Sequence, residues 1–160
     1  MEQKHSYTLK EAEQYFAKAL NGEVWEFLGK GDRTALDDER MLYAAYASCY
    51  HWLQAGAGAH QERGEWLIAH VCAVLGLKDE ALRHASRCFE LTQQHPDLMK
   101  DFDVAYGFEA MARANALAGN RDAALKYYRL AQEAGEQITD VEDKSIFLGD
   151  FNSANWYGVK

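Results

Sequence analysis

The chain contains two copies of one helical pattern, and this repeat constrains its fold more than any other feature. A shift of 43 residues places Gly76 on Gly119 and Ala81 on Ala124. In each copy an apolar segment ends at the glycine, an Asp-containing turn follows, and an amphipathic segment begins with the alanine. Such repeats are typical of stacked helical hairpins, because one hairpin alone cannot bury its apolar face. The sequence therefore predicts an all-α fold.

The second copy resembles a tetratricopeptide repeat. The matching positions are three in the first helix, the turn glycine and three in the second helix, namely Phe108, Met111, Ala112, Gly119, Ala124, Tyr128 and Ala131. The first copy agrees at Ile68, Ala69, Gly76 and Ala81 and departs at Ala85 and Cys88. The resemblance implies a right-handed stack of antiparallel helical hairpins, a tetratricopeptide-like solenoid, in which the first helix of each hairpin lines a concave surface. Two other segments, 47–56 and 149–158, are similar to short uncharacterised bacterial proteins, a likeness that implies no activity.

Apolar periodicity and helix breakers predict about seven helices in a single domain, residues 1–160. The repeats are recognisable at about 62–95 and 105–138, and residues 139–160 read as a capping helix and tail. The repeat interval exceeds the family's usual period of about 34 residues. The extra residues lie around Gln94 to Phe102, so the connection between the copies is expected to be long.

Capping patterns locate several helix starts. Thr8 with Glu11 and Thr139 with Glu142 have the spacing of capping boxes, which places the first and seventh helices directly after the two threonines. Pro96 marks the start of the fifth helix. The seventh helix is expected to present an apolar stripe, and the aromatic tail to pack back onto the last repeat; the residues concerned are Val141, Ile146, Phe147, Phe151 and Trp156.

Composition narrows the range of partners and compartments. The formal net charge of −8 makes nucleic acid and anionic membranes improbable partners. The first residues are polar and contain no apolar signal core, and no run approaches the roughly 18 apolar residues of a membrane span. Three cysteines, Cys49, Cys72 and Cys88, lie on apolar helix faces and are expected to be reduced core thiols. A cytoplasmic location is the expectation.

Two residue pairs suggest chemistry, although neither carries a prediction of it. His84 and Cys88 are four apart on one helix face, as two metal ligands would be, but no third ligand has a matching spacing. Cys49 and His51 face opposite ways on a helix, whereas a Cys49–His70 dyad between helices stays open. Phosphate-binding loops, nucleophile elbows and HExxH patterns do not occur. We therefore predict no catalytic, cofactor-binding or metal-binding residue.

The predicted functional surface combines aromatic and charged residues on the first helices of the two copies. Its members are Arg63, Trp66, His70, Tyr106, Glu109 and Arg113. Such mixtures are enriched at binding surfaces, which predicts a non-catalytic scaffold for a protein, a peptide or a second copy of the chain. The two arginines favour an acidic or carboxylate-bearing partner. Alternatively, Glu109 and Arg113 form only an intrahelical pair and Trp66 is buried.

A second reading belongs to a different functional class. Four aromatic side chains could line a closed pocket of a small-molecule sensor or an enzyme, namely Trp52, Trp66, His70 and Tyr106. A closed apolar pocket would favour this reading, and an open charged groove would favour the scaffold.

Overall fold

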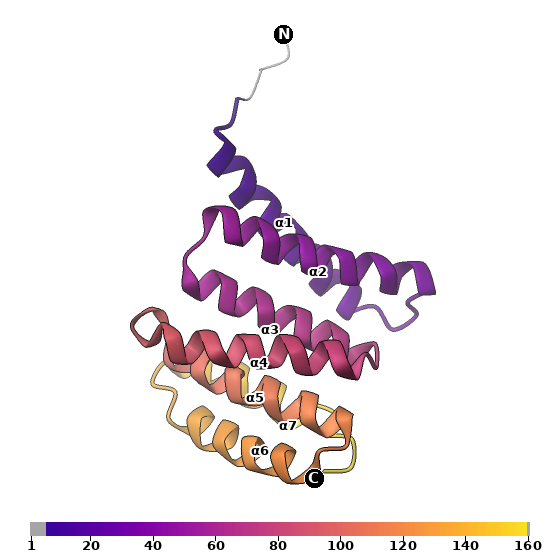
Figure 1. Cartoon of the computed structure of the whole chain (residues 1–160), viewed down its shortest axis with the longest axis vertical. Helices are drawn as coiled ribbons and strands as arrows, with labels where there is room; N and C mark the ends of the chain where they lie inside the picture. The colour runs from indigo at the N-terminus through magenta and orange to yellow at the C-terminus, as the bar shows by residue number, and fades with distance from the viewer. Residues whose placement is uncertain (1–5, 160) are drawn as a thin grey trace.

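The computed structural model of the chain describes residues 6–159. Within that range the chain is all-helical, and its elements are α1 (Leu9–Leu28), α2 (Ala35–Ala55), α3 (Gly58–Val74), α4 (Lys78–Gln94), the short 3-10 turn η1 (Pro96–Leu98), α5 (Asp101–Ala118), α6 (Arg121–Glu136) and α7 (Val141–Ser153). The predicted all-α architecture is confirmed, and Figure 1 shows the helices following one another from α1 and α2 at one end to α6 and α7 at the other.

The two predicted turns have the same geometry. Gly76 and Gly119 take left-handed backbone angles, with φ of 74° and 81°. In both turns the amide after the glycine bonds to a carbonyl five residues earlier, Leu77 to Cys72 at 2.8 Å and Asn120 to Asn115 at 2.9 Å. This is the glycine-dependent ending that lets one helix stop and the next begin at once. The shift of 43 residues is therefore a repeat of structure as well as of sequence.

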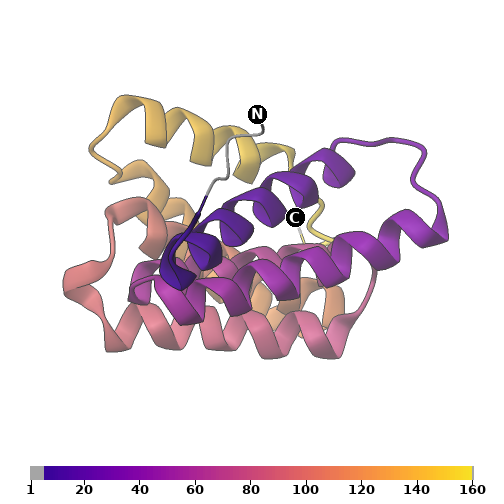
Figure 2. The same cartoon turned by 90° about the horizontal axis from the view of Figure 1, so that it is seen from above.

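The helices pack as consecutive hairpins, α1 with α2, α3 with α4, and α5 with α6. Neighbouring hairpins meet through α2 with α3 and α4 with α5, and the first helices α3 and α5 also touch. Ala81 and Ala124, which begin the second helix of each copy, are fully buried, as the repeat predicts. α7 packs on α5 and α6. Figure 2 shows α1 and α7 on the side of the stack opposite α4.

Two details of the predicted helix starts are wrong. α5 begins at Asp101 instead of Pro96, because Met99 and Lys100 are extended and separate it from η1. The N-cap of α7 is Asp140, whose carboxylate accepts from the Asp143 amide. Thr139 is not a cap, since its amide and hydroxyl both donate to Asp101 on α5.

The C-terminal segment packs back as predicted, but with fewer residues. Phe147, Phe151 and Trp156 are buried against α5 and α6. Val141 and Ile146, expected on the same apolar stripe, are 83% and 54% exposed. Only the face of α7 that meets the last hairpin is buried, because nothing in the described chain covers its other side.

The cysteines are core residues. All three are free and buried. Burial raises the pKa of Cys49 to about 12 and that of Cys72 to about 11, so both are protonated at neutral pH. Across residues 6–159 no helix is long and apolar enough to cross a membrane.

Candidate functional site

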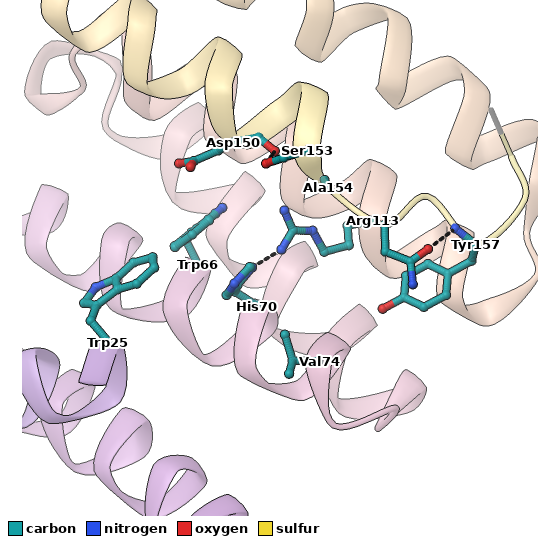
Figure 3. Close-up of a pocket in the computed structure, with 10 residues that line it drawn as sticks. Trp25, Trp66, His70, Val74, Arg113, Asp150, Ser153, Ala154 and Tyr157 are labelled. Atoms are coloured by element: carbon teal, nitrogen blue, oxygen red, sulfur yellow. Dashed lines mark hydrogen bonds between the residues drawn. The ribbon is translucent and has the colours of Figure 1, made fainter. Parts of the chain in front are cut away.

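Two adjoining cavities lie where the inner sides of α1, α3, α5 and α7 meet, and together we call them the inner groove. The larger has a volume of about 400 Å³ and the smaller about 240 Å³. Trp25, Trp66 and Asp150 line both cavities and so join them. The larger cavity is completed by Glu62, Arg63, Phe102, Asp103, Tyr106 and Ile146, and the smaller by His70, Val74, Arg113, Ser153, Ala154, Asn155 and Tyr157. Figure 3 shows how α1, α3, α5 and the C-terminal segment surround the smaller one.

Aromatic rings from four elements form one wall of the inner groove. The Trp25 ring of α1 lies nearly parallel to the Trp66 ring of α3, with 6.1 Å between centroids. Trp66 meets Tyr106 of α5 edge-on at 5.2 Å, and Tyr106 meets Phe147 of α7 at 4.8 Å. Trp25 is 46% exposed and Trp66 is half-buried. The rings thus offer accessible apolar surface, and Trp66 is not enclosed.

The predicted site residues contact one another in pairs that are 43 residues apart. Trp66 Nε1 donates to Glu109 Oε2 at 2.8 Å. Arg113 Nη1 donates to His70 Nδ1, as Figure 3 shows. Corresponding positions of the two repeats therefore meet directly and hold α3 against α5. Because arginine can only donate, His70 Nδ1 must accept, and the ring proton lies on Nε2.

Arg63 is paired with a carboxylate in a two-bond arrangement. Its Nε lies 2.7 Å from Asp103 Oδ1, and its Nη2 lies 2.9 Å from Asp103 Oδ2. Asp103 also accepts from the Lys100 amide and so caps the start of α5. The Arg63 guanidinium stands 5.0 Å above the Phe102 ring. The positive charge of Arg63 is therefore balanced by a carboxylate of the same chain.

Arg113 is also paired with a carboxylate of the same chain. Its Nη2 forms an ion pair with Glu109, whose residue surface is only 1% exposed. Burial raises the pKa of Glu109 and lowers the pKa of Arg113 to about 10. The Trp66 hydrogen bond opposes the shift at Glu109, and the negative charge of Asp150 opposes the shift at Arg113. The intrahelical pair of the alternative interpretation is therefore present, and it is buried beneath the inner groove.

The ionisable groups of the groove that are not paired with an arginine are carboxyls. Asp150 is exposed and accepts a hydrogen bond from the Tyr106 hydroxyl at 2.6 Å. Glu62 is 1% exposed and accepts from Cys88 Sγ at 3.1 Å. Burial raises the pKa of Glu62 to about 8, although the Cys88 hydrogen bond lowers it in part. The pairing of both arginines removes the premise on which an acidic partner was expected.

Among the groove residues that were not predicted from the sequence, Trp25 and Asp150 are the two that line both cavities. Trp25 lies on α1, the first helix of the first hairpin, and the rule that first helices line the concave surface would have found it. α1 lies outside the two recognisable copies, so the repeat pattern does not mark Trp25. Asp150 carries no such signal, because α7 belongs to no repeat and only its packing on α5 brings it to the groove.

The four-aromatic pocket of the alternative reading does not form. Trp66, His70 and Tyr106 lie together, but Trp52 stacks on His60 with 4.2 Å between centroids. Trp52 lines a different cavity, which has only Arg63 in common with the inner groove. α2 turns this side chain toward the α2–α3 junction.

The residues that had suggested metal or thiol chemistry have other partners. His84 bonds to Glu65 at 2.6 Å and to the Tyr46 hydroxyl at 2.8 Å. Within residues 6–159 no group of three or more His, Cys, Asp or Glu side chains is arranged to hold a metal ion. Cys49 Sγ packs against Gly64, while His70 Nδ1 is occupied by Arg113.

Comparisons with known protein families, with curated proteins and with solved structures gave no match to this chain.

Proposed function

We propose that the protein is a non-catalytic binding module that holds a segment of another protein in the inner groove. The observation that carries the proposal is the convergence of partly exposed aromatic rings from α1, α3 and α5 on two joined cavities. Large rigid rings that keep accessible surface are the residues that contribute most to protein recognition. The tetratricopeptide resemblance supports the same role, and three buried free thiols fit a reducing, cytoplasmic setting.

The hydrogen bonds beneath the groove support this role because they fix its shape. Trp66 is held by Glu109, and Tyr106 is held by Asp150. Side chains that are ordered before binding lose less conformational entropy when a partner arrives. A rigid aromatic surface on packed helices is thus suited to hold a peptide.

A small-molecule sensor is the second candidate, and one observation favours it. The larger cavity, at about 400 Å³, falls within the size range of small-ligand pockets. Its continuity with the second cavity through Trp25, Trp66 and Asp150 makes the site elongated, and an extended or helical peptide fits such a site better than a compact ligand.

The proposal is tested by selecting peptides from a random displayed library on the purified full chain. The selected peptides are then measured against Trp25→Ala and against Tyr43→Ala. Tyr43 is 63% exposed on α2 and lines neither cavity, so it is a matched aromatic control. We expect Trp25→Ala to weaken binding by about 1–3 kcal/mol, roughly 5- to 150-fold, and Tyr43→Ala to change it little. Failure to select any peptide, or equal losses in the two variants, would contradict the proposal.

A further inference from the structure

We propose that the larger cavity of the inner groove receives an arginine side chain of the bound segment, with Trp25 and Trp66 as its walls and Asp150 as its counter-ion. This inference rests on the proposed function and gives the bound segment a chemical character, namely a basic peptide.

Charge is the first reason. Two carboxylates, Asp103 and Asp150, line the larger cavity against the single cation Arg63, and Glu62 lines it as a buried neutral acid. Arg63 already donates to both oxygens of Asp103, through its Nε and Nη2. Asp150 has the uncharged Tyr106 hydroxyl as its hydrogen-bond donor. Arg113 lies within electrostatic range of Asp150, but its ion pair is with Glu109. A cationic group entering the cavity would therefore complete the charge balance, and a second carboxylate would be repelled.

The aromatic wall is the second reason. A cation is attracted to the face of an aromatic ring, and most strongly to tryptophan. Trp25 keeps 46% of its surface exposed, and Trp66 borders the same cavity. The rim of the cavity already shows this type of contact, since Arg63 and Lys100 stand 5.0 and 5.7 Å from the Phe102 ring. Trp66 is already stacked with His70 and with Trp25, so the exposed surface of Trp25 offers a place for a cation supplied by a partner.

The shape of the cavity favours arginine over lysine. A guanidinium is planar, so it can stack on an indole ring and at the same time present two N–H groups to one carboxylate. Asp150 borders the same cavity as both tryptophans. A lysine ammonium would reach the carboxylate, but it would be more strongly hydrated and would stack less well. We therefore expect lysine to bind more weakly than arginine.

The experiment uses three small probes, the acetylated amides of arginine, of its neutral isostere citrulline, and of the acidic residue glutamate; arginine and citrulline differ only at the side-chain head. Each probe is titrated into the full chain, and the indole N–H signals are followed by NMR. We expect the arginine probe to give saturable shifts at the Trp25 and Trp66 signals. The citrulline probe is expected to bind about tenfold more weakly, and the glutamate probe not at all.

Variants locate the effect. Asp150→Asn keeps an oxygen for the Tyr106 hydroxyl and removes the charge, so it should weaken the arginine probe about tenfold and leave the citrulline probe unchanged. Asp122→Asn, an exposed acid on α6 that lines neither cavity, is the control. Trp25→Leu keeps an apolar wall and removes the aromatic face, and it too should weaken the arginine probe.

The outcomes separate this inference from the proposed function. Absence of a saturable shift with the arginine probe, equal affinity for citrulline, or indifference to Asp150→Asn overturns the inference. Selected peptides that need Trp25 but contain no basic residue would leave the groove as the binding site and would also overturn the arginine assignment. Selected peptides whose affinity is unchanged by Trp25→Ala would contradict both the proposed function and the arginine assignment.

Discussion

Glu62 illustrates how a single buried side chain links the core of this protein to its groove. It lies on α3, borders the larger cavity and accepts a hydrogen bond from Cys88 of α4. Its surroundings favour the neutral carboxylic acid, because burial removes the water that would stabilise the charge. At neutral pH the uncharged Glu62 side chain therefore keeps its hydrogen bond to Cys88, and ionising it would destabilise the folded state.

The first prediction concerns this carboxyl and pH. Burial raises the pKa of Glu62 from an ordinary 4.5 to about 8, so between these values the folded state binds a proton that the unfolded state has lost. Its contribution to stability is full below pH 4.5 and is lost as the pH rises to 8. Glu62→Gln removes this dependence and should gain stability over the wild type by up to ~1.4 kcal/mol for each pH unit in that interval. Chemical unfolding of both proteins at pH 5 and at pH 8 measures the difference in their free energies of unfolding. The same difference at both pH values would contradict the prediction.

The second prediction concerns the contact between α2 and α3. A methyl group on Gly64 would lie 2.8 Å from Cys49 Sγ and 3.1 Å from Cys49 Cβ. Gly64→Ala should therefore force the helices apart and lower the free energy of unfolding by about 1–3 kcal/mol. Gly22 is the control, because it lies within α1 and has nothing within 4 Å of the added Cβ. Gly22→Ala should raise stability by about 0.5–1 kcal/mol. Thermal unfolding of both variants measures these changes. A Gly64→Ala variant with an unchanged melting temperature would show that the interface can relax.

At the scale of elements, the predictable features are those that a short sequence window determines. Thr8 forms its capping box with Glu11 as expected, and Gly76 and Gly119 end their helices in matching turns. The prediction fails at Thr139, because the choice between two possible caps depends on Asp101, which is 38 residues away. Local spacing carries no information about a partner that distant.

The candidate site shows the same division. The six predicted residues converge because they follow the repeat, and a contact between equivalent positions is a consequence of stacking. The pairing of Arg63 with Asp103 was not foreseen, and it changes the chemistry from cationic to acidic. Asp150 reaches the groove only through the docking of α7, which no periodicity describes.

The third prediction concerns α7 and the tail. Phe147, Phe151 and Trp156 are buried on α5 and α6, so removing residues 146–160 would expose a large apolar surface. The truncated chain should melt at a lower temperature or aggregate. Ile146→Ser is the control, because Ile146 is 54% exposed and the change should stay within about 0.5 kcal/mol. A soluble truncated chain with an unchanged melting temperature would mean that the last hairpin needs no cap.

For the whole molecule, the stack places the inner groove, the proposed binding surface, between the first helices and α7. The chain has a net charge of −8, and the inner groove is not an exception to it. Both arginines of the groove are paired with carboxylates, so they leave no unbalanced positive charge there. The field of the protein and the local groups at the groove therefore have the same sign, and a basic segment would be attracted at long range as well as at contact. Binding should weaken as salt is raised, because exposed charges are screened.

The central claim is that partners bind on the inner side of the stack, and NMR mapping with a selected peptide tests it most directly. Backbone and indole signals of the full chain are assigned and followed as the peptide is added. We predict that the largest shifts fall on residues that line the inner groove, above all Trp25, Trp66 and Asp150. Shifts concentrated on the exposed face of α2, around Tyr43 and Tyr50, with the groove unchanged, would contradict the account.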